Sequence, residues 1–79
     1  MVSAEIMGNV IRKEQKSKKT SQEVVSGLAE LDRTHYSKIE RGLRSPTVDT
    51  IFRIAYAMGV KPHELVAEIE KAVEEQDGH

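Results

Sequence analysis

Apolar residues recur along the first part of the chain at the spacing of an α-helix. From Ala4 to about Gln15 this spacing brings them onto one stripe of the helix surface. The apolar positions of this stripe are Ile6, Met7, Val10 and Ile11. No segment alternates strictly between apolar and polar residues, as a half-buried β-strand does. The pattern therefore predicts an all-α chain, with Ser3 as the cap of its first helix.

Two short helices are predicted next, separated by only a few residues. Ser21 can cap a helix over about residues 22–29, and Asp32 can cap another that ends near Arg41. Gly42 favours this ending because glycine adopts the left-handed conformation at low cost. The residues expected to face the core are Val25, Leu28, Ala29, Tyr36 and Ile39.

The rest of the chain predicts two further helices. Thr47 can cap a helix over residues 48–58, which Gly59 ends, and Pro62 suits the first position of a last helix that extends to about residue 75. The core positions of these two helices are expected to be Ile51, Phe52, Ile54, Ala55, Met58, Leu65, Val66, Ile69 and Val73. The final segment, EEQDGH at residues 74–79, is too polar to bury and is expected to fray. The predicted fold is a compact all-α domain of five helices.

The size and composition of the chain limit the kinds of protein to which it can belong. Its 79 residues suit one small domain, residues 1–79, with a core at about residues 6–65. There is no cysteine, which excludes disulfides and thiolate metal sites. No apolar run approaches the roughly 18 residues of a membrane span, and the N-terminus lacks the order of a signal peptide. We therefore expect a soluble cytoplasmic protein with no membrane partner.

The net charge of −1 conceals a difference between the two parts of the chain. Residues 1–46 contain nine Lys and Arg against six Asp and Glu, whereas residues 47–79 contain three against seven. Such a division is typical of a chain whose basic part meets a polyanion and whose acidic part faces elsewhere.

The two short central helices have the arrangement of a helix-turn-helix, with the second helix over about residues 32–41. Only Tyr36 and Ile39 are available to hold that helix on a core. Its other positions are mostly polar or charged, namely Arg33, Thr34, His35, Ser37, Lys38 and Arg41. A DNA major groove about 12 Å wide admits one helix, while the preceding helix crosses the phosphates. The arrangement therefore predicts a double-stranded DNA partner, contacted through the major groove.

Four short motifs, in this order, resemble the Cro and lambda-repressor family, also called Xre-like. They are Ser21-Gln22, SKIERG at residues 37–42, Ser45-Pro46, and AYAMGV at residues 55–60. The resemblance runs from about Ile6 to Leu65 and implies a lambda-repressor-like fold that binds DNA. Glu30 departs from the family, which usually has glycine in this turn. A left-handed conformation at Glu30 costs on the order of 1 kcal/mol, so either the turn is strained or its geometry differs.

Within that family, DRTHYSKIERG at residues 32–42 is similar to the recognition helix of restriction-modification controller proteins. This resemblance implies a small cytoplasmic homodimer, from a prokaryote or a phage, that binds a palindromic operator and regulates transcription. It implies neither the operator sequence nor whether binding activates or represses.

The resemblance also assigns DNA contacts to individual residues. Arg33, Thr34 and His35 are expected to approach bases, with Arg33 pairing with guanine or clamping a phosphate and Thr34 meeting a thymine methyl group. Phosphate or groove-wall contacts are expected from Gln22, Ser37, Lys38, Arg44 and Ser45. Simple solvent exposure is the alternative for each of these side chains.

Two ionisable residues of the same region, Glu40 and His35, have other possible roles. By the resemblance, Glu40 is structural and pairs with an early arginine such as Arg12, which adds about 0 to 1 kcal/mol in an exposed pair. His35 is a metal ligand or pH switch only if it has a partner, and the candidate one turn before it, Asp32, is already a cap. We therefore expect no metal site. The sequence also has no catalytic motif and no phosphate-binding loop, so we expect no enzyme activity and no cofactor.

An apolar seam on the last two helices predicts a homodimer interface. Its residues are Tyr56, Val66, Ile69 and Val73. Burying this seam against a second copy would give a symmetric dimer that matches two half-sites about 34 Å apart. The alternative is that these residues cover the chain's own core. A protein-interaction module, such as an antitoxin, is the alternative function, and no small-molecule effector is evident.

Overall fold

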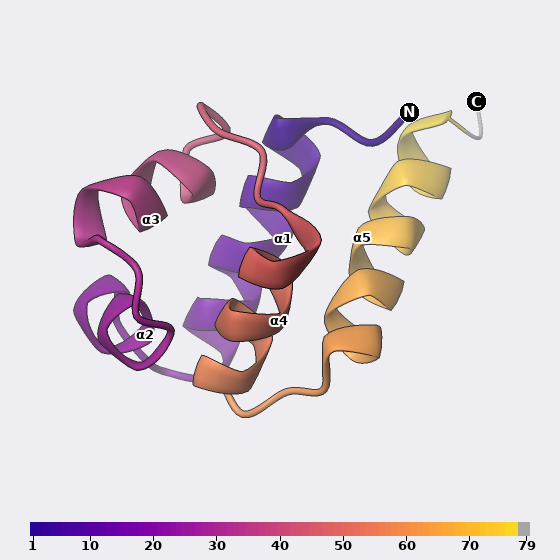
Figure 1. The fold of residues 1–79 in the computed structure, drawn as a ribbon. Coiled ribbons are helices and arrows are strands. Elements are labelled where there is room, and N and C mark those ends of the chain that lie inside the picture. The colour runs from indigo at the N-terminus through magenta and orange to yellow at the C-terminus, as the bar shows by residue number, and fades with distance from the viewer. Residues whose placement is uncertain (78–79) are drawn as a thin grey trace.

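The computed structural model describes residues 1–77, which form five helices. They are α1 (Ala4–Ser17), α2 (Gln22–Leu28), α3 (Arg33–Glu40), α4 (Val48–Ala57) and α5 (Pro62–Asp77). α1 and α4 lie between the α2–α3 pair on one side and α5 on the other (Figure 1). α1 contacts α3 and α5, while α4 contacts α2 and α5. The predicted all-α fold of five helices is confirmed.

The helices begin and end where local chemistry favours it. The caps of α1 to α4 are Ser3, Ser21, Asp32 and Thr47. Each cap side chain accepts a hydrogen bond from a free backbone amide of the first turn, which would otherwise lack a partner. Gly42 and Gly59 follow α3 and α4 with φ angles of 78° and 75°. Both lie in the left-handed region, where glycine carries no steric penalty.

All five helices contribute to one core. Its most deeply buried side chains include Ile11, Val25, Tyr36, Ile39, Ile54 and Leu65. Tyr36 and Ile39 are the two residues predicted to anchor α3, and both are completely buried. Apart from the buried Glu40, the polar side chains of α3 are therefore free to reach the surface.

Three residues predicted to face the core do not. Leu28 is 67% exposed, Val66 is 46% exposed and Phe52 is 43% exposed. Leu28 lies beside the buried face of α2, whose inward positions are taken by Val25 and Ser26. Phe52 follows the buried Ile51 by one position, which turns its side chain by about 100° around the helix axis. The prediction was wrong because the buried face of each helix is set by the helices packed against it, which the apolar residues alone do not identify.

The end of α5 also differs from the prediction. Residues 74–77 are exposed, as expected, but they are helical rather than frayed. Gly78 and His79, the other residues of that polar segment, lie outside the described residues. Among residues 1–77, no helix is long and apolar enough to cross a membrane.

Candidate nucleic-acid interface

α2 and α3 are joined by the four residues 29–32. Glu30 adopts φ of 58° in this turn, and the amide of Leu31 donates to the carbonyl of Ser26 at 2.9 Å, which closes the end of α2. A left-handed glutamate carries a strain of about 1 kcal/mol that glycine would avoid. Of the two expected alternatives, the strained turn is the one observed.

The start of α3 is fixed by Asp32. One carboxylate oxygen, Oδ2, accepts the backbone amides of Thr34 and His35 at 3.0 and 3.2 Å. This satisfies two free amides and places a negative charge at the positive end of the helix dipole. The same carboxylate is therefore committed to the helix, and no three His, Asp or Glu side chains gather as metal ligands within residues 1–77.

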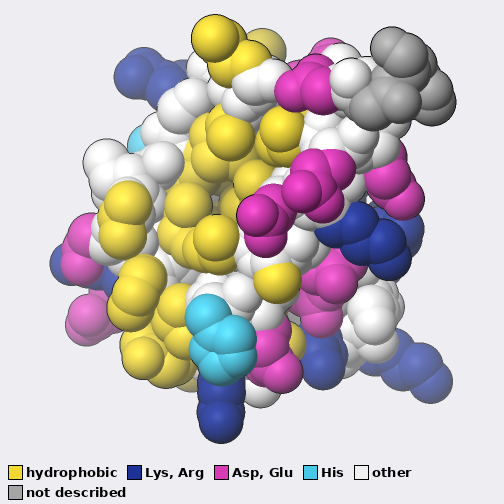
Figure 2. All heavy atoms as spheres, turned by 90° about the vertical axis from the view of Figure 1, so that its right-hand side faces the viewer, with side chains coloured by type: hydrophobic (Ala, Val, Ile, Leu, Met, Phe, Trp, Pro, Cys, Tyr) yellow, Lys and Arg dark blue, Asp and Glu magenta, His cyan; other side chains and the backbone are white. Residues whose placement is uncertain are grey.

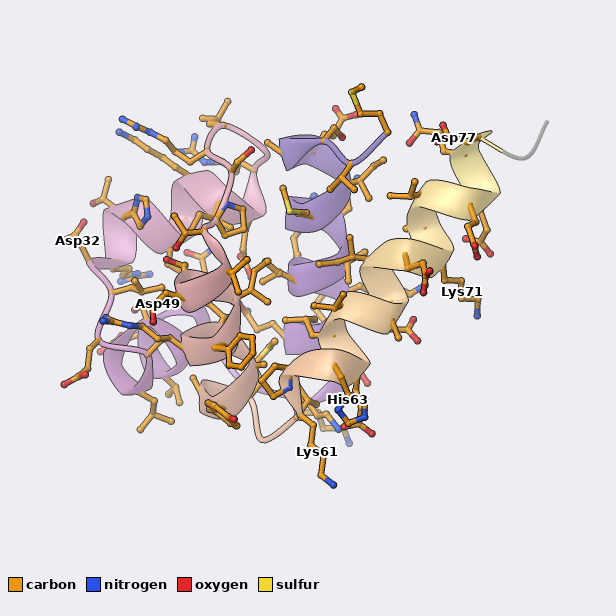
Figure 3. The ribbon with its side chains drawn as sticks, turned by 45° about the vertical axis from the view of Figure 1, so that its right-hand side comes forward. Asp32, Asp49, Lys61, His63, Lys71 and Asp77 are labelled. Atoms are coloured by element: carbon orange, nitrogen blue, oxygen red, sulfur yellow. The ribbon has the colours of Figure 1, made fainter. Side chains whose placement is uncertain are left out.

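The polar side chains predicted to contact DNA lie at or near the surface. Arg33, Thr34, Arg44 and Ser45 are exposed, whereas Gln22, His35, Ser37 and Lys38 are half-buried. The start of α3, marked by Asp32, lies on the side of the molecule opposite Lys71 of α5 (Figure 3). The first turn of α3 thus presents Arg33 and Thr34 to solvent while the later residues are partly covered by their neighbours.

A close backbone contact with α1 supports the end of α3. A Cβ atom on Gly8 would lie 2.3 Å from the carbonyl oxygen of Ile39 and 2.8 Å from that of Glu40. Only glycine allows α1 and α3 to approach this closely. Sequence reasoning missed Gly8, although a glycine within a helical pattern, which costs about 1 kcal/mol relative to alanine, was an available signal.

Glu40 lies at the centre of a buried polar network that joins α1, α2 and α3. It is 2% exposed, and its Oε1 accepts from Nε2 of Gln22 at 2.6 Å while Oε2 accepts from the hydroxyl of Tyr36 at 2.9 Å. The predicted pairing with Arg12 is wrong, because the guanidinium of Arg12 donates to Asn9 at 3.0 Å. Within residues 1–77 no basic side chain forms an ion pair with Glu40.

The network continues from Tyr36 into α1. The Tyr36 hydroxyl also lies 2.9 Å from Oε1 of Gln15, which is itself buried. Burial raises the pKa of Tyr36, and the charge of Glu40 and the hydrogen bond to it raise that pKa further. The hydroxyl therefore keeps its proton in mildly alkaline solution. Gln15 was missed by sequence reasoning, although it follows Ile11 by four residues and so continues the inward stripe of α1.

A second surface, remote from the first turn of α3, is apolar. Exposed hydrophobic side chains gather over α4 and α5 (Figure 2). Tyr56 is 66% exposed and packs edge to face on Phe52 with the ring centroids 6.2 Å apart, and Val66 is also exposed. These three residues, with the shallow groove beside Val66, are called the apolar face below.

The predicted dimer residues divide between this face and the core. Tyr56 and Val66 are exposed, as an interface requires, but Ile69 is only 5% exposed and Val73 is half-buried. Ile69 follows Leu65 by one turn and packs with it in the chain's own core. The dimer contact of Ile69 stays a prediction, to which this residue can bring only the small exposed part of its side chain at the groove beside Val66.

The chain is similar to known proteins over most of its length. The family model described as helix-turn-helix matches residues 11–65, which include all of α2, the turn and α3. Control protein C.MunI of Mycoplasma sp is 38% identical over 65 residues, covering 81% of this chain and 88% of that protein. Control protein C.BamHI of Bacillus amyloliquefaciens is 39% identical over 62 residues, covering 77% of this chain and 76% of that protein.

A solved structure agrees with these matches. The restriction-modification controller protein C.AhdI from Aeromonas hydrophila superimposes with a TM-score of 0.74 at 32% sequence identity. The superposition covers 78% of this chain and 94% of that one. Sequence and fold thus lead to the same group of proteins.

Proposed function

The chain belongs to the helix-turn-helix family of DNA-binding transcriptional regulators, and on this premise we propose that it is a controller that binds a palindromic operator as a homodimer. The family consists of regulators rather than enzymes. The similarity to three control or controller proteins supports the controller role. The observation that carries the proposal is the exposed first turn of α3, held on the core by the completely buried Tyr36 and Ile39.

Base recognition is assigned to the first turn of α3. Arg33 and Thr34 are exposed, and a helix inserted in the major groove brings such first-turn side chains to the base edges. The Arg33 guanidinium can donate two hydrogen bonds to one guanine, and the Thr34 methyl group can contact a thymine methyl group. His35 is half-buried and supplies one hydrogen bond from the edge of the same turn.

Backbone contacts are assigned to residues around that turn. Lys38 and Ser37 lie one turn further along α3, Arg44 and Ser45 lie in the loop after it, and Gln22 begins α2. Such contacts fix the orientation of the protein on the duplex without reading its sequence. Arg44 and Lys38 supply positive charge for phosphates, while Gln22, Ser37 and Ser45 supply neutral donors.

Homodimer formation is assigned to the apolar face. Tyr56, Phe52 and Val66 present exposed apolar surface, and covering it with a second copy removes that surface from water. A two-fold symmetric dimer suits half-sites about 34 Å apart, one helical turn of DNA. This function requires no cofactor, metal ion or small-molecule effector. The similarity to bacterial control proteins supports the cytoplasm of a prokaryote as its location.

The proposal is tested by selecting bound duplexes from a random-sequence library and measuring affinity for the selected duplex at two salt concentrations. We expect a two-fold symmetric sequence and an affinity that falls steeply with salt, because Lys and Arg contacts release counterions from the phosphates. Recovery of no common sequence from the library would contradict the regulator function.

Arg33→Ala tests the assignment of base recognition. The variant should lose about 1 to 3 kcal/mol of binding free energy and tolerate other bases at one position. Lys71→Ala removes one positive charge on the opposite side of the molecule and serves as the matched control (Figure 3). If Arg33→Ala binds more weakly yet keeps the same base preference, Arg33 contacts only a phosphate.

A further inference from the structure

A buried carboxylate without a cation stands behind the proposed DNA-binding surface. Glu40 is 2% exposed, and within residues 1–77 its hydrogen-bond donors are neutral groups, the amide of Gln22 and the hydroxyl of Tyr36. Taking a carboxylate out of water is costly, and an apolar residue of similar size is often as good or better for stability. Stability alone therefore does not explain why Glu40 occupies this position.

The bond from Gln22 to Glu40 is short and directional. Nε2 of Gln22 lies 2.6 Å from Oε1 of Glu40, which is slightly shorter than the usual range of N–H···O hydrogen bonds. It links the first residue of α2 to the last residue of α3, across the two helices that would approach DNA. One amide hydrogen of Gln22 is therefore held, and the direction of the whole amide group is fixed with it.

The second N–H of the Gln22 amide is available to donate a hydrogen bond to another group. A glutamine amide has two N–H donors and one carbonyl acceptor, and only one donor is used by Glu40. Gln22 is half-buried, whereas Glu40 is covered, so an incoming anion can reach the amide but not the carboxylate. The second N–H thus lies between a buried negative charge and the solvent.

We propose that Glu40 is a positioning residue for DNA binding, which fixes the side chain of Gln22 so that its second N–H meets a phosphate oxygen of the DNA backbone. This inference rests on the proposed function. Without Glu40, the long Gln22 side chain would sample several rotamers, and DNA binding would have to order it. With Glu40, the side chain is ordered before DNA arrives.

The test separates fold stability from affinity for the duplex selected by the wild-type protein. Glu40→Met keeps the volume of the side chain but has no acceptor for Gln22, so the fold should persist while affinity falls about fivefold. Glu40→Gln keeps an acceptor oxygen and should restore most of the affinity. Gln15→Met removes a different polar group of the network that does not bond Gln22, and it is the control expected to leave affinity in place.

A double variant establishes that Glu40 acts through Gln22. Gln22→Ala should lower affinity about tenfold because a hydrogen bond to a charged phosphate is lost. Adding Glu40→Met to Gln22→Ala should cause no further loss, since the residue to be positioned is gone. If Glu40→Met lowers affinity equally in both backgrounds, or does not lower it in the wild-type background, the positioning role is refuted.

A measurement on the wild-type protein does not depend on any variant folding. Side-chain ¹⁵N relaxation in the absence of DNA should show the amide of Gln22 to be ordered, in contrast to the exposed Gln76 of α5. A Gln22 amide as mobile as that of Gln76 would overturn the proposal. If instead the wild-type protein selects no DNA sequence, the proposed function fails, and the positioning role fails with it.

Discussion

The α2–α3 pair and the α4–α5 pair are held to the rest of the molecule in different ways. α2 and α3 are 7 and 8 residues long, and their buried positions include the polar Ser26 and Glu40. α4 and α5 are 10 and 16 residues long, and the buried residues of both are apolar. The turn between α2 and α3 contains a left-handed glutamate, whereas the corresponding position after α4 is glycine.

This difference matches the two proposed tasks. Apolar packing stabilises helices without specifying a single orientation, because dispersion and burial depend weakly on direction. Hydrogen bonds in a buried network require defined distances and angles, so they fix how one helix lies against the next. A helix that reads bases must be oriented, whereas a pair of helices that supplies an apolar interface must chiefly be stable.

The largest expected effect concerns the apolar face. Val66→Glu places a charge in the proposed interface twice, once from each copy, and should weaken dimerisation by about 3 kcal/mol without unfolding the monomer. Sedimentation equilibrium measures the dimer dissociation constant, and circular dichroism measures the fold. Val24→Glu is the matched control, since Val24 on α2 is 49% exposed and Val66 is 46% exposed. Persistence of a tight dimer in Val66→Glu would move the interface elsewhere.

The next effect concerns the contact of α1 with α3. Gly8→Ala forces a methyl group into the backbone carbonyls of Ile39 and Glu40, so we expect the free energy of unfolding to fall by about 2 kcal/mol. The gain in helix propensity of about 1 kcal/mol is already included in this figure. Urea unfolding measures the change.

Gly27→Ala is the matched control for this contact. Nothing lies within 4 Å of a Cβ atom on Gly27, so the same substitution in α2 should stabilise the protein by up to about 1 kcal/mol. Equal effects of the two substitutions would show that the α1–α3 contact is not tight.

Alkaline pH should lower the free energy of unfolding through Tyr36, which anchors α3 in the core. The unfolded state loses the tyrosine proton near pH 10, whereas the folded state keeps it because the pKa of Tyr36 is raised. Above about pH 10 the unfolded state therefore binds fewer protons, and the free energy of unfolding falls by about 1.4 kcal/mol per pH unit. Below about pH 10 this contribution is fully present.

Tyr36→Phe should remove that pH dependence. Urea midpoints of the wild type and the variant, measured from neutral pH into the alkaline range, isolate the contribution of Tyr36 from other groups. Tyr56→Phe changes an exposed tyrosine on α4 and should leave the slope of the wild type unaltered. Identical slopes in wild type and Tyr36→Phe would refute the raised pKa of Tyr36.

The smallest expected effect comes from substitutions at the left-handed positions after α2 and α4. Glu30→Gly gives the α2–α3 turn the residue type found after α4, and relief of the left-handed strain should stabilise the protein by about 0.5 to 1 kcal/mol. The reverse change, Gly59→Ala, meets nothing within 4 Å and should destabilise by about 1 kcal/mol through its φ alone. Thermal unfolding measures both, and opposite signs are required.

The sequence predicted the features that depend on neighbouring residues. Caps such as Asp32, the helix end at Gly42 and the anchors Tyr36 and Ile39 follow from local rules, and the structure confirms them. The strain at Glu30 was recognisable because one residue type departed from a familiar turn.

The features that depend on distant residues could not be predicted. Predicting that Leu28 and Phe52 are exposed requires knowing which face of each helix is buried, and that face is set by helices far away in the sequence. The partners of Glu40 are 18 and 4 residues away, and nothing in the spacing distinguishes Gln22 from the expected Arg12. The contact of Gly8 with the end of α3 requires the packing of two helices to be known.

The distribution of aromatic residues has a practical consequence for spectroscopy. The chain has two tyrosines and no tryptophan. Tyr36 is buried beside Glu40, whereas Tyr56 is exposed on the apolar face. Each tyrosine is therefore a native optical label for one end of the molecule, and single-tyrosine variants would report occupancy of the DNA side and of the subunit contact as separate fluorescence signals.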